Sequence, residues 1–264
     1  MNTYKTNLLT YLANKYGSDK GIVHGGPPHK YTYMYDIIFQ PLKNSKINFL
    51  EIGLAVGGPE VGGAIDRQAI SPSVQMWLDY FPQAHIYGFD ICDFSHMKNE
   101  RFTFIRGDSG SVQDMRRLSN SASCFDIIID DGSHASFHQQ NAFKHLFHKL
   151  NPGGIYIIED LQWQSPTYEN NYTKLPLTRD FFISFFEEDR YIENPLLSAD
   201  FMHSVHSSLS NYAWFPAFNG NASPAKIFVL IKSWILSREG NFSASWVVRK
   251  TTEIYCFAAC AGGS

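Results

Sequence analysis

One alternation dominates the middle of the chain: a short β-rich apolar run, then a polar or glycine-rich turn, then a helical pattern. This alternation is typical of βαβ units, in which helices join parallel strands and cover the sheet. It predicts an α/β fold built on a doubly wound, mostly parallel sheet. The runs are "INFLEIG" (47–53), "IYGFDI" (86–91), "FTFIRGD" (102–108), "FDIIIDDG" (125–132) and "GGIYIIEDL" (153–161).

The segment before this region is predicted to form two helices, over residues 4–15 and 31–42. The glycine- and proline-rich stretch "YGSDKGIVHGGPPHK" joins them and suits a surface loop near a ligand. We therefore divide the chain into an N-terminal helical lid, residues 1–45, and a larger domain, residues 46–264.

The segments after residue 162 carry weaker patterns. Helices are predicted over 179–189 and 225–236, and the β-rich residues 245–259 are predicted to close the sheet as a hairpin. The crossover helix before the fifth run is predicted to end at Pro152, Gly153 and Gly154, with His138, His145 and His148 mostly on its polar side.

Charge and hydropathy exclude several classes of partner. The 264 residues are 44% apolar and 18% charged with a net charge of −3, which is typical of a globular protein with no polyanion-binding surface. We expect no nucleic acid and no membrane among its partners. No apolar run reaches about 18 residues and the first fifteen residues lack a signal-peptide segment, so a cytoplasmic location is expected.

Acidic residues follow four of the five predicted strands, at the edge where open parallel sheets bind ligands. Asp90 ends the second run, the usual place of a carboxylate that accepts from two ribose hydroxyls. The first run brings Glu51 and a turn with Gly53, Gly57 and Gly58, whose spacing is not that of a dinucleotide fingerprint. A positively charged nucleoside suits this acidic edge better than NAD, and S-adenosylmethionine (SAM) is such a molecule.

Residues at two further positions are candidates for contacting the nucleoside. Asp108, followed by Ser109, is placed to accept from an adenine amino group or a nearby backbone. The alternative is that Asp108 only caps the helix that begins in "SGSVQDMRRL". Asp130 either touches the nucleoside or orients its loop.

The fourth and fifth runs are predicted to lie side by side, so that Asp131 meets Glu159 and Asp160. Three carboxylates without a basic partner in either motif repel one another, and a divalent cation is the common remedy. An all-oxygen set favours Mg²⁺ or Mn²⁺ over Zn²⁺. His134 follows Asp131 closely enough to face the same pocket and suits a general base near neutral pH.

These motifs resemble a known family. The set "KYGSDKG", "YTYMYDIIFQPL", "FLEIG", "GFDI", "RGDSGS", "IIIDDGSH" and "GGIYIIEDL" is similar to class I SAM-dependent methyltransferases, specifically the metal-dependent macrocin and mycinamicin sugar O-methyltransferases. The resemblance covers about residues 12–165, and its most specific parts are "DDGSH" and "IIEDL".

The resemblance implies a Rossmann-like sheet of seven strands with a reversed last strand, and a homo-oligomer, dimer or tetramer. It implies SAM over the ends of the first strands and Mg²⁺ near the transferred methyl group. The activity it implies is O-methylation of a sugar hydroxyl on a small-molecule natural product, as in antibiotic biosynthesis. Asp131, Glu159 and Asp160 match the metal positions and His134 the base, while Glu51, Gly53, Asp90 and Asp108 match the cofactor side.

Three other functions stay open at this point. The same acids suit a methyltransferase acting on a catechol or a polyketide hydroxyl. A non-catalytic partner of a tailoring oxidase would keep the fold without transferring a methyl group. A metal-dependent hydrolase is a weaker alternative, because it leaves Asp90 and the glycine turn without a role.

Overall fold

The computed structural model describes residues 7–22, 29–54, 71–161, 166–215 and 227–233. Gly57 and Gly58 of the predicted glycine turn, and the hairpin predicted over 245–259, lie outside these residues. No helix within the described ranges has the length and hydropathy needed to span a bilayer.

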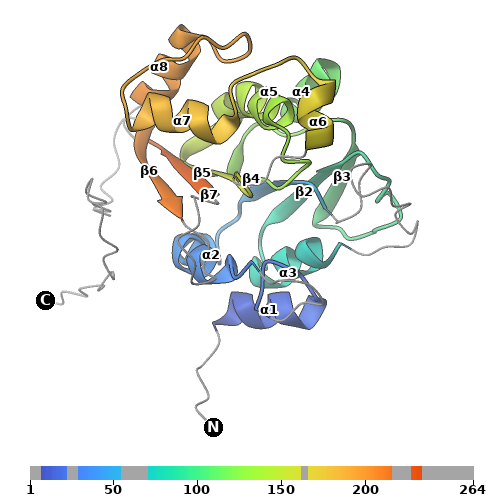
Figure 1. Ribbon diagram of the computed structural model, residues 1–264. Coiled ribbons are helices and arrows are strands. Elements are labelled where there is room, and N and C mark those ends of the chain that lie inside the picture. The colour runs from blue at the N-terminus through green and yellow to red at the C-terminus, as the bar shows by residue number, and fades with distance from the viewer. Residues whose placement is uncertain (1–6, 23–28, 55–70, 162–165, 216–226, 234–264) are drawn as a thin grey trace, which may run out of the picture.

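A seven-stranded sheet forms the centre of the molecule (Figure 1), in the order β3-β2-β1-β4-β5-β7-β6. The first five strands in this order are parallel, and β7 runs antiparallel to both β5 and β6. The predicted doubly wound sheet with a reversed last strand is therefore confirmed. The strands are β1 (Asn48–Ile52), β2 (His85–Asp90), β3 (Phe102–Arg106), β4 (Phe125–Asp130), β5 (Leu150–Ile158), β6 (Leu209–Phe215) and β7 (Ile227–Lys232).

Helices cover both faces of this sheet, as the βαβ pattern predicts. Figure 1 shows α1, α2 and α3 on one face and α4 to α8 on the other. The described helices are α1 (Leu8–Tyr16), α2 (Thr32–Phe39) with the 3₁₀ turn Gln40–Leu42, α3 (Pro72–Tyr80), α4 (Val112–Ser119), α5 (Ser136–Leu146) with the 3₁₀ turn Phe147–Lys149, α6 (Pro166–Asn171), α7 (Thr178–Phe186) and α8 (Ala199–Ser208).

Alternation along each strand sends side chains into two cores. On β4, Ile127 and Ile129 pack with the aromatic cluster of α2 and α3, whereas Ile128 packs with α5 and α7 on the opposite face. All three isoleucines are fully buried, as expected for a central parallel strand covered on both sides. The N-terminal helices belong to the first of these cores.

The prediction of a helix over residues 225–236 is wrong, because Ile227–Lys232 forms strand β7. The first four residues of β7 are all buried, and a short, continuous apolar run fits a buried strand as well as a buried helix. Among the described residues, β7 pairs with β6 (Leu209–Phe215), which forms the last strand of the sheet order. Pro152, Gly153 and Gly154 also differ from the prediction, since they lie inside β5 and not at the end of the crossover helix.

Candidate functional site

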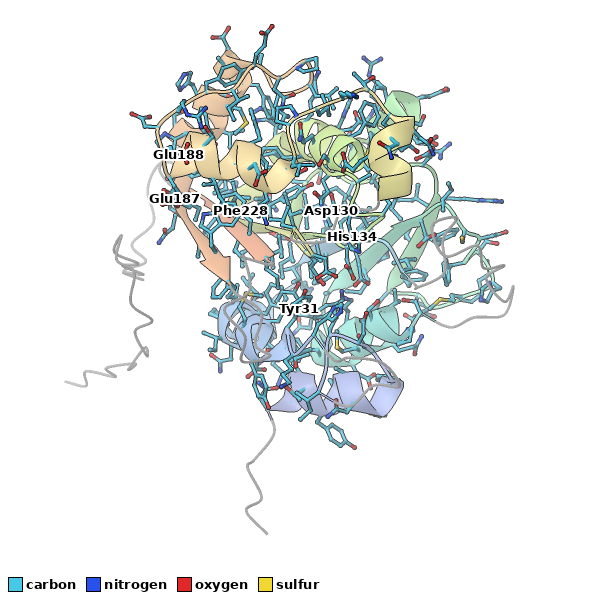
Figure 2. The ribbon with its side chains drawn as sticks, viewed as in Figure 1. Tyr31, Asp130, His134, Glu187, Glu188 and Phe228 are labelled. Atoms are coloured by element: carbon cyan, nitrogen blue, oxygen red, sulfur yellow. The ribbon has the colours of Figure 1, made fainter. Side chains whose placement is uncertain are left out.

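The carboxyl ends of β4 and β5 lie next to each other, as predicted. Asp130 pairs with Ile158 in the register, and the backbone N–H of Glu159 donates to the carbonyl of Asp130 over 2.9 Å. The chain therefore places Asp131 beside Glu159 and Asp160. Figure 2 shows His134 close to the end of β4, on the side where Tyr31 approaches from the N-terminal segment.

Asp131, His134 and Asp160 bring one donor atom each within 4.8 Å of one another. Nε2 of His134 lies 3.9 Å from Oδ2 of Asp160. Both residues have left-handed backbones, with φ of 61° and 52°, a conformation that non-glycine residues adopt at a cost and that clusters at functional sites. The two carboxylates in this arrangement suit a hard divalent cation that keeps room for water or substrate, and the imidazole lies beside them.

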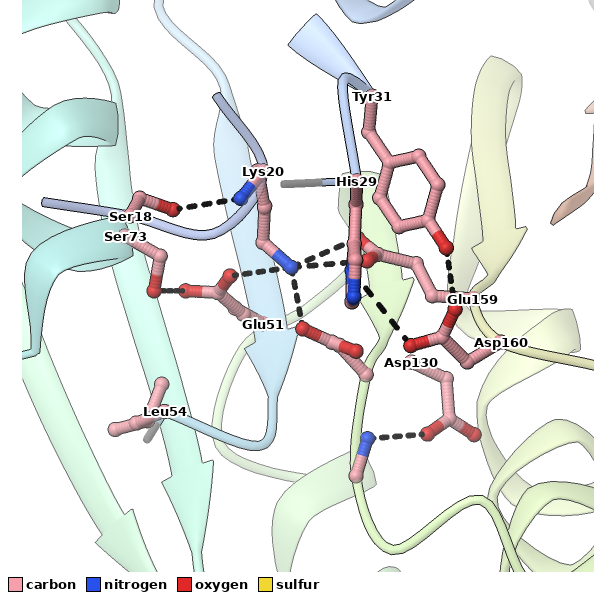
Figure 3. Close-up of polar contacts among 12 residues, drawn as sticks. Ser18, Lys20, His29, Tyr31, Glu51, Leu54, Ser73, Asp130, Glu159 and Asp160 are labelled. Atoms are coloured by element: carbon pink, nitrogen blue, oxygen red, sulfur yellow. Dashed lines mark hydrogen bonds and ion pairs between the residues drawn. The ribbon is translucent and has the colours of Figure 1, made fainter. Parts of the chain in front are cut away.

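Lys20 is the basic partner that the strand motifs lack. Its side chain comes from the loop after α1 and is only 1% exposed. Its ammonium donates to Asp131 and to both oxygens of Glu159, at 2.9 and 3.0 Å, and lies 3.9 Å from Glu51 (Figure 3). Neither strand motif contains a basic residue, and a loop more than a hundred residues away from Asp131 and Glu159 supplies one.

The pKa of Lys20 depends on two opposing influences, its burial and the charges of the neighbouring carboxylates. Burial alone would lower it, but the carboxylates of Asp131, Glu159 and Glu51 raise it well above its usual value. Lys20 therefore carries a full charge at neutral pH. Burial raises the pKa of Asp131, while the ammonium of Lys20 acts in the opposite direction.

The N-terminal segment supplies three more contacts to the same acids. The hydroxyl of Tyr35 donates to Oε1 of Glu159, and the hydroxyl of Tyr31 donates to Oδ1 of Asp160. Nδ1 of His29 lies 3.8 Å from the other oxygen of Asp160. Tyr31 and Tyr35 are fully buried, so their rings belong to the core and only their hydroxyls reach the site.

Gly53 lets the end of β1 lie close to the loop that follows β4. Its φ is +83°, and a Cβ at this position would overlap the carbonyl of Asp131. Glu51, two residues earlier, is fully buried and accepts from the hydroxyl of Ser73 over 2.8 Å. Burial raises the pKa of Glu51 to about 7. Gly57 lies outside the described residues, so its predicted contact with the cofactor remains a prediction.

Asp90 ends β2 at the same edge of the sheet and is buried. Its carboxylate accepts the backbone N–H of Leu54 and that of Cys92, each over 2.7 Å. These bonds tie the turn after β1 to the end of β2. Each oxygen has a second lone pair, so the predicted acceptance from ribose hydroxyls is compatible with these bonds.

Asp108 does not cap the following helix, so that alternative is wrong. Ser111 caps α4, while Oδ1 of Asp108 accepts from the backbone of Gly110 over 2.7 Å. The side chain of Asp108 stays 42% exposed and is available to a ligand. The carbonyl of Ser109 is held by Asn141 over 2.7 Å, which fixes this turn against α5.

His138 lies in the interior rather than on the polar side of its helix. It is 5% exposed, its Nδ1 contacts the hydroxyl of Ser133, and its Nε2 lies 3.9 Å from Oδ1 of Asp108. The helical pattern misplaced it because the turn at Asp108 and the ring of Tyr172, and not solvent, face this side of α5. Asp130 is also buried, and its Oδ1 accepts from Gly132 over 3.3 Å, which orients the loop.

Sequence reasoning did not identify Lys20, Tyr31 or Tyr35 as members of the site. Tyr31 is the N-cap of α2 and Tyr35 lies four residues further along, a spacing that places both hydroxyls on the same side. A lysine in a glycine-rich loop gives no comparable signal. Its burial depends on how α1 packs against α2 and α3.

Several known proteins resemble this chain, although no protein-family model matches it. Mycinamicin VI 2''-O-methyltransferase from Micromonospora griseorubida is 39% identical over 157 residues, which are 58% of this chain and 36% of that protein. Demethylmacrocin O-methyltransferase from Streptomyces fradiae is 39% identical over 160 residues, covering 59% and 36% of the two chains. An 8-demethyl-8-alpha-L-rhamnosyl tetracenomycin-C 2'-O-methyltransferase from Streptomyces olivaceus is 39% identical over 154 residues, covering 58% and 38%.

A solved structure of a mycinamycin-pathway methyltransferase, MycE, in complex with Mg, SAH and mycinamycin VI, aligns with a TM-score of 0.62. The two chains are 26% identical, and the match covers 87% of this chain and 54% of that one. These comparisons confirm the resemblance to sugar O-methyltransferases and the predicted fold. The chain spans just over a third of the curated relatives that it matches.

Proposed function

We propose that this chain is a SAM- and Mg²⁺-dependent O-methyltransferase that methylates a hydroxyl of a sugar, or of another vicinal diol, on a natural product. The observation that carries the proposal is the group Asp131, His134 and Asp160, whose donor atoms meet at the carboxyl edge of a methyltransferase-type sheet. The relatives support it, because their names describe O-methyltransferases of glycosylated macrolides and tetracenomycins.

The cofactor is proposed to lie over the ends of β1, β2 and β3. Asp90 would accept from the ribose hydroxyls, and Asp108 with Ser109 would receive the adenine. Gly53 and Gly57 would let the backbone approach the methionine part, with Glu51 and Asp130 as the neighbouring acids. This assignment is supported by the shared edge on which β1, β2 and β3 end.

Asp131 and Asp160 fit a divalent cation, since one carboxylate oxygen of each converges on the same place beside the imidazole of His134. A bound Mg²⁺ would act as a Lewis acid that acidifies and orients the acceptor hydroxyl. Glu159 remains the predicted third ligand. In the present arrangement both of its oxygens contact Lys20, and one of them would have to exchange that partner for the ion.

His134 is proposed to take the proton of the acceptor hydroxyl. The acceptor oxygen then bonds to the methyl carbon as the bond from that carbon to sulfur breaks. The products are a methyl ether and S-adenosylhomocysteine, with the proton on the imidazole. Tyr31 and His29, which contact Asp160, would hold that carboxylate in place.

The N-terminal segment, residues 1–45, is proposed to act as a lid on the methyltransferase domain, residues 46–264. Lys20, His29, Tyr31 and Tyr35 support this role because each contacts an acid of the site. A cytoplasmic location and a homo-oligomeric state are also proposed. The relatives favour sugar acceptors over catechols and over a non-catalytic role, so we propose no second function.

A turnover assay with SAM and a panel of acceptors tests this function. Glycosides with vicinal hydroxyls should be methylated in the presence of Mg²⁺, and simple catechols should not. EDTA should abolish transfer and added Mg²⁺ should restore it. Asp131→Ala should abolish transfer while calorimetry still detects SAM binding. Full activity in excess EDTA would overturn the metal-dependent mechanism.

A further inference from the structure

Lys20 is held rigidly where its charge faces the metal-binding acids. Helix α1 ends at Gly17, whose φ of +76° turns the chain back, and the N–H of Ser18 bonds to the carbonyl of Ala13 over 2.9 Å. The carbonyl of Lys20 accepts from the N–H of Thr32 over 3.1 Å, at the start of α2. The loop is thus fixed at both ends, and the buried side chain has a defined direction.

The contacts of the ammonium connect three strands. Asp131 follows β4, Glu159 follows β5 and Glu51 lies in β1, and Lys20 reaches all three. These strands are neighbours in the order β1-β4-β5, so the ammonium sits across the middle of the acidic edge. Buried carboxylates this close together repel one another, and a cation among them offsets that repulsion.

We propose that Lys20 is a built-in counter-ion of the metal site. It keeps the acids assembled when the divalent ion is absent, and it lowers the affinity for that ion. This inference rests on the proposed function, because it concerns the same acids. It adds a positioning residue that neither strand motif contains.

Lys20 lowers the affinity for the divalent ion for two reasons, its charge and its contacts with the same carboxylates. A fixed positive charge beside Asp131 repels an incoming divalent cation. Lys20 also holds both oxygens of Glu159, so an ion that uses this carboxylate has to compete with the ammonium. The part of this stabilisation that is lost when the ion binds lowers the ion affinity by the same free energy.

The test compares the full chain with Lys20→Met and Lys20→Gln, using Mn²⁺ alone as the probe. Lys15→Met is the matched control, since Lys15 lies in α1 and forms an exposed ion pair with Asp79. Free Mn²⁺ is measured by electron paramagnetic resonance, and thermal unfolding is followed in EDTA and in saturating Mn²⁺. Neither readout depends on turnover.

Both Lys20 variants should bind Mn²⁺ at least about tenfold more tightly than the unsubstituted chain, while unfolding at a lower temperature in EDTA. A Lys20→Met chain that folds only with Mn²⁺ supports the proposal equally, and if it never folds, Lys20→Gln decides. Unchanged or weaker Mn²⁺ binding by folded Lys20 variants would overturn the counter-ion role and leave the proposed function standing. An unsubstituted chain that binds no Mn²⁺ would overturn the proposed metal site itself.

Discussion

The ammonium of Lys20 lies 2.9 and 3.0 Å from the two oxygens of Glu159, although 139 residues separate them in the chain. This contact joins the N-terminal segment to the end of β5, and Tyr35 reinforces it from the same segment. The N-terminal segment and the acidic edge of the sheet are therefore joined by one buried polar network. Changes on either side of this network should affect both stability and the site.

Replacing His134 by Ala should lower kcat by about 10² to 10⁴, because general acid–base catalysis contributes that much. The affinity for S-adenosylhomocysteine, measured by calorimetry, should stay unchanged, since His134 is placed beside Asp160 and away from β2. His203→Ala, an exposed histidine of α8, serves as the control. A His134→Ala enzyme that keeps the original rate from pH 6 to 9 would exclude the role as base.

Replacing Gly53 by Ala should destabilise the protein more than the same change at Gly17. Both glycines have positive φ, and for each the left-handed backbone costs alanine about 1–2 kcal/mol. At Gly17 no atom lies within 4 Å of the added Cβ, whereas at Gly53 the Cβ would overlap the carbonyl of Asp131. Urea unfolding of the two variants measures the difference. Equal losses of unfolding free energy would show that the loop at Asp131 yields to the methyl group.

Replacing Tyr35 by Phe should lower the free energy of unfolding by about 1–3 kcal/mol, since it removes a donor from a buried carboxylate. The ring stays in the core, so packing is preserved. Tyr11→Phe is the control, because Tyr11 is 58% exposed and a surface change of this kind stays within about 0.5 kcal/mol. Denaturant titration distinguishes the two. A Tyr35→Phe chain as stable as the control would mean that Lys20 alone satisfies Glu159.

Replacing Glu51 by Gln should change how stability depends on pH. Burial raises the pKa of Glu51 from 4.5 to about 7, so between these values the folded chain binds more protons than the unfolded chain. This carboxyl therefore stabilises the fold below about pH 4.5, and that contribution, up to about 3 kcal/mol, is lost as the pH rises to 7. Glu51→Gln should lose less stability over this range.

Urea unfolding in EDTA at intervals from pH 5 to 8 measures this dependence. Glu100→Gln is the control, because Glu100 is an exposed residue between β2 and β3. The free-energy difference between Glu51→Gln and the original chain should grow with pH, while that of the control stays flat. Parallel curves for all three chains would contradict the raised pKa.

Local patterns were sufficient for most of the fold. The alternation of apolar runs and helices predicted β1 to β5, because period and turn residues are properties of neighbouring positions. The same reasoning failed at residues 227–232, where a continuous apolar run does not distinguish a buried strand from a buried helix. Only pairing with β5 and β6 decides that case.

The sequence by itself determined that Asp131, Glu159 and Asp160 lie at one edge of a parallel sheet, because strands joined by one crossover helix end at the same side. It also determined the positions of Gly53 and Asp90 at that edge. Tertiary structure alone decided that Lys20, Tyr31 and Tyr35 complete the acidic cluster, and that His138 is buried. Those contacts depend on how α1 packs against α2 and α3 and on how α2 and α5 pack over the end of the sheet, and such long-range packing produces no periodic pattern in the sequence.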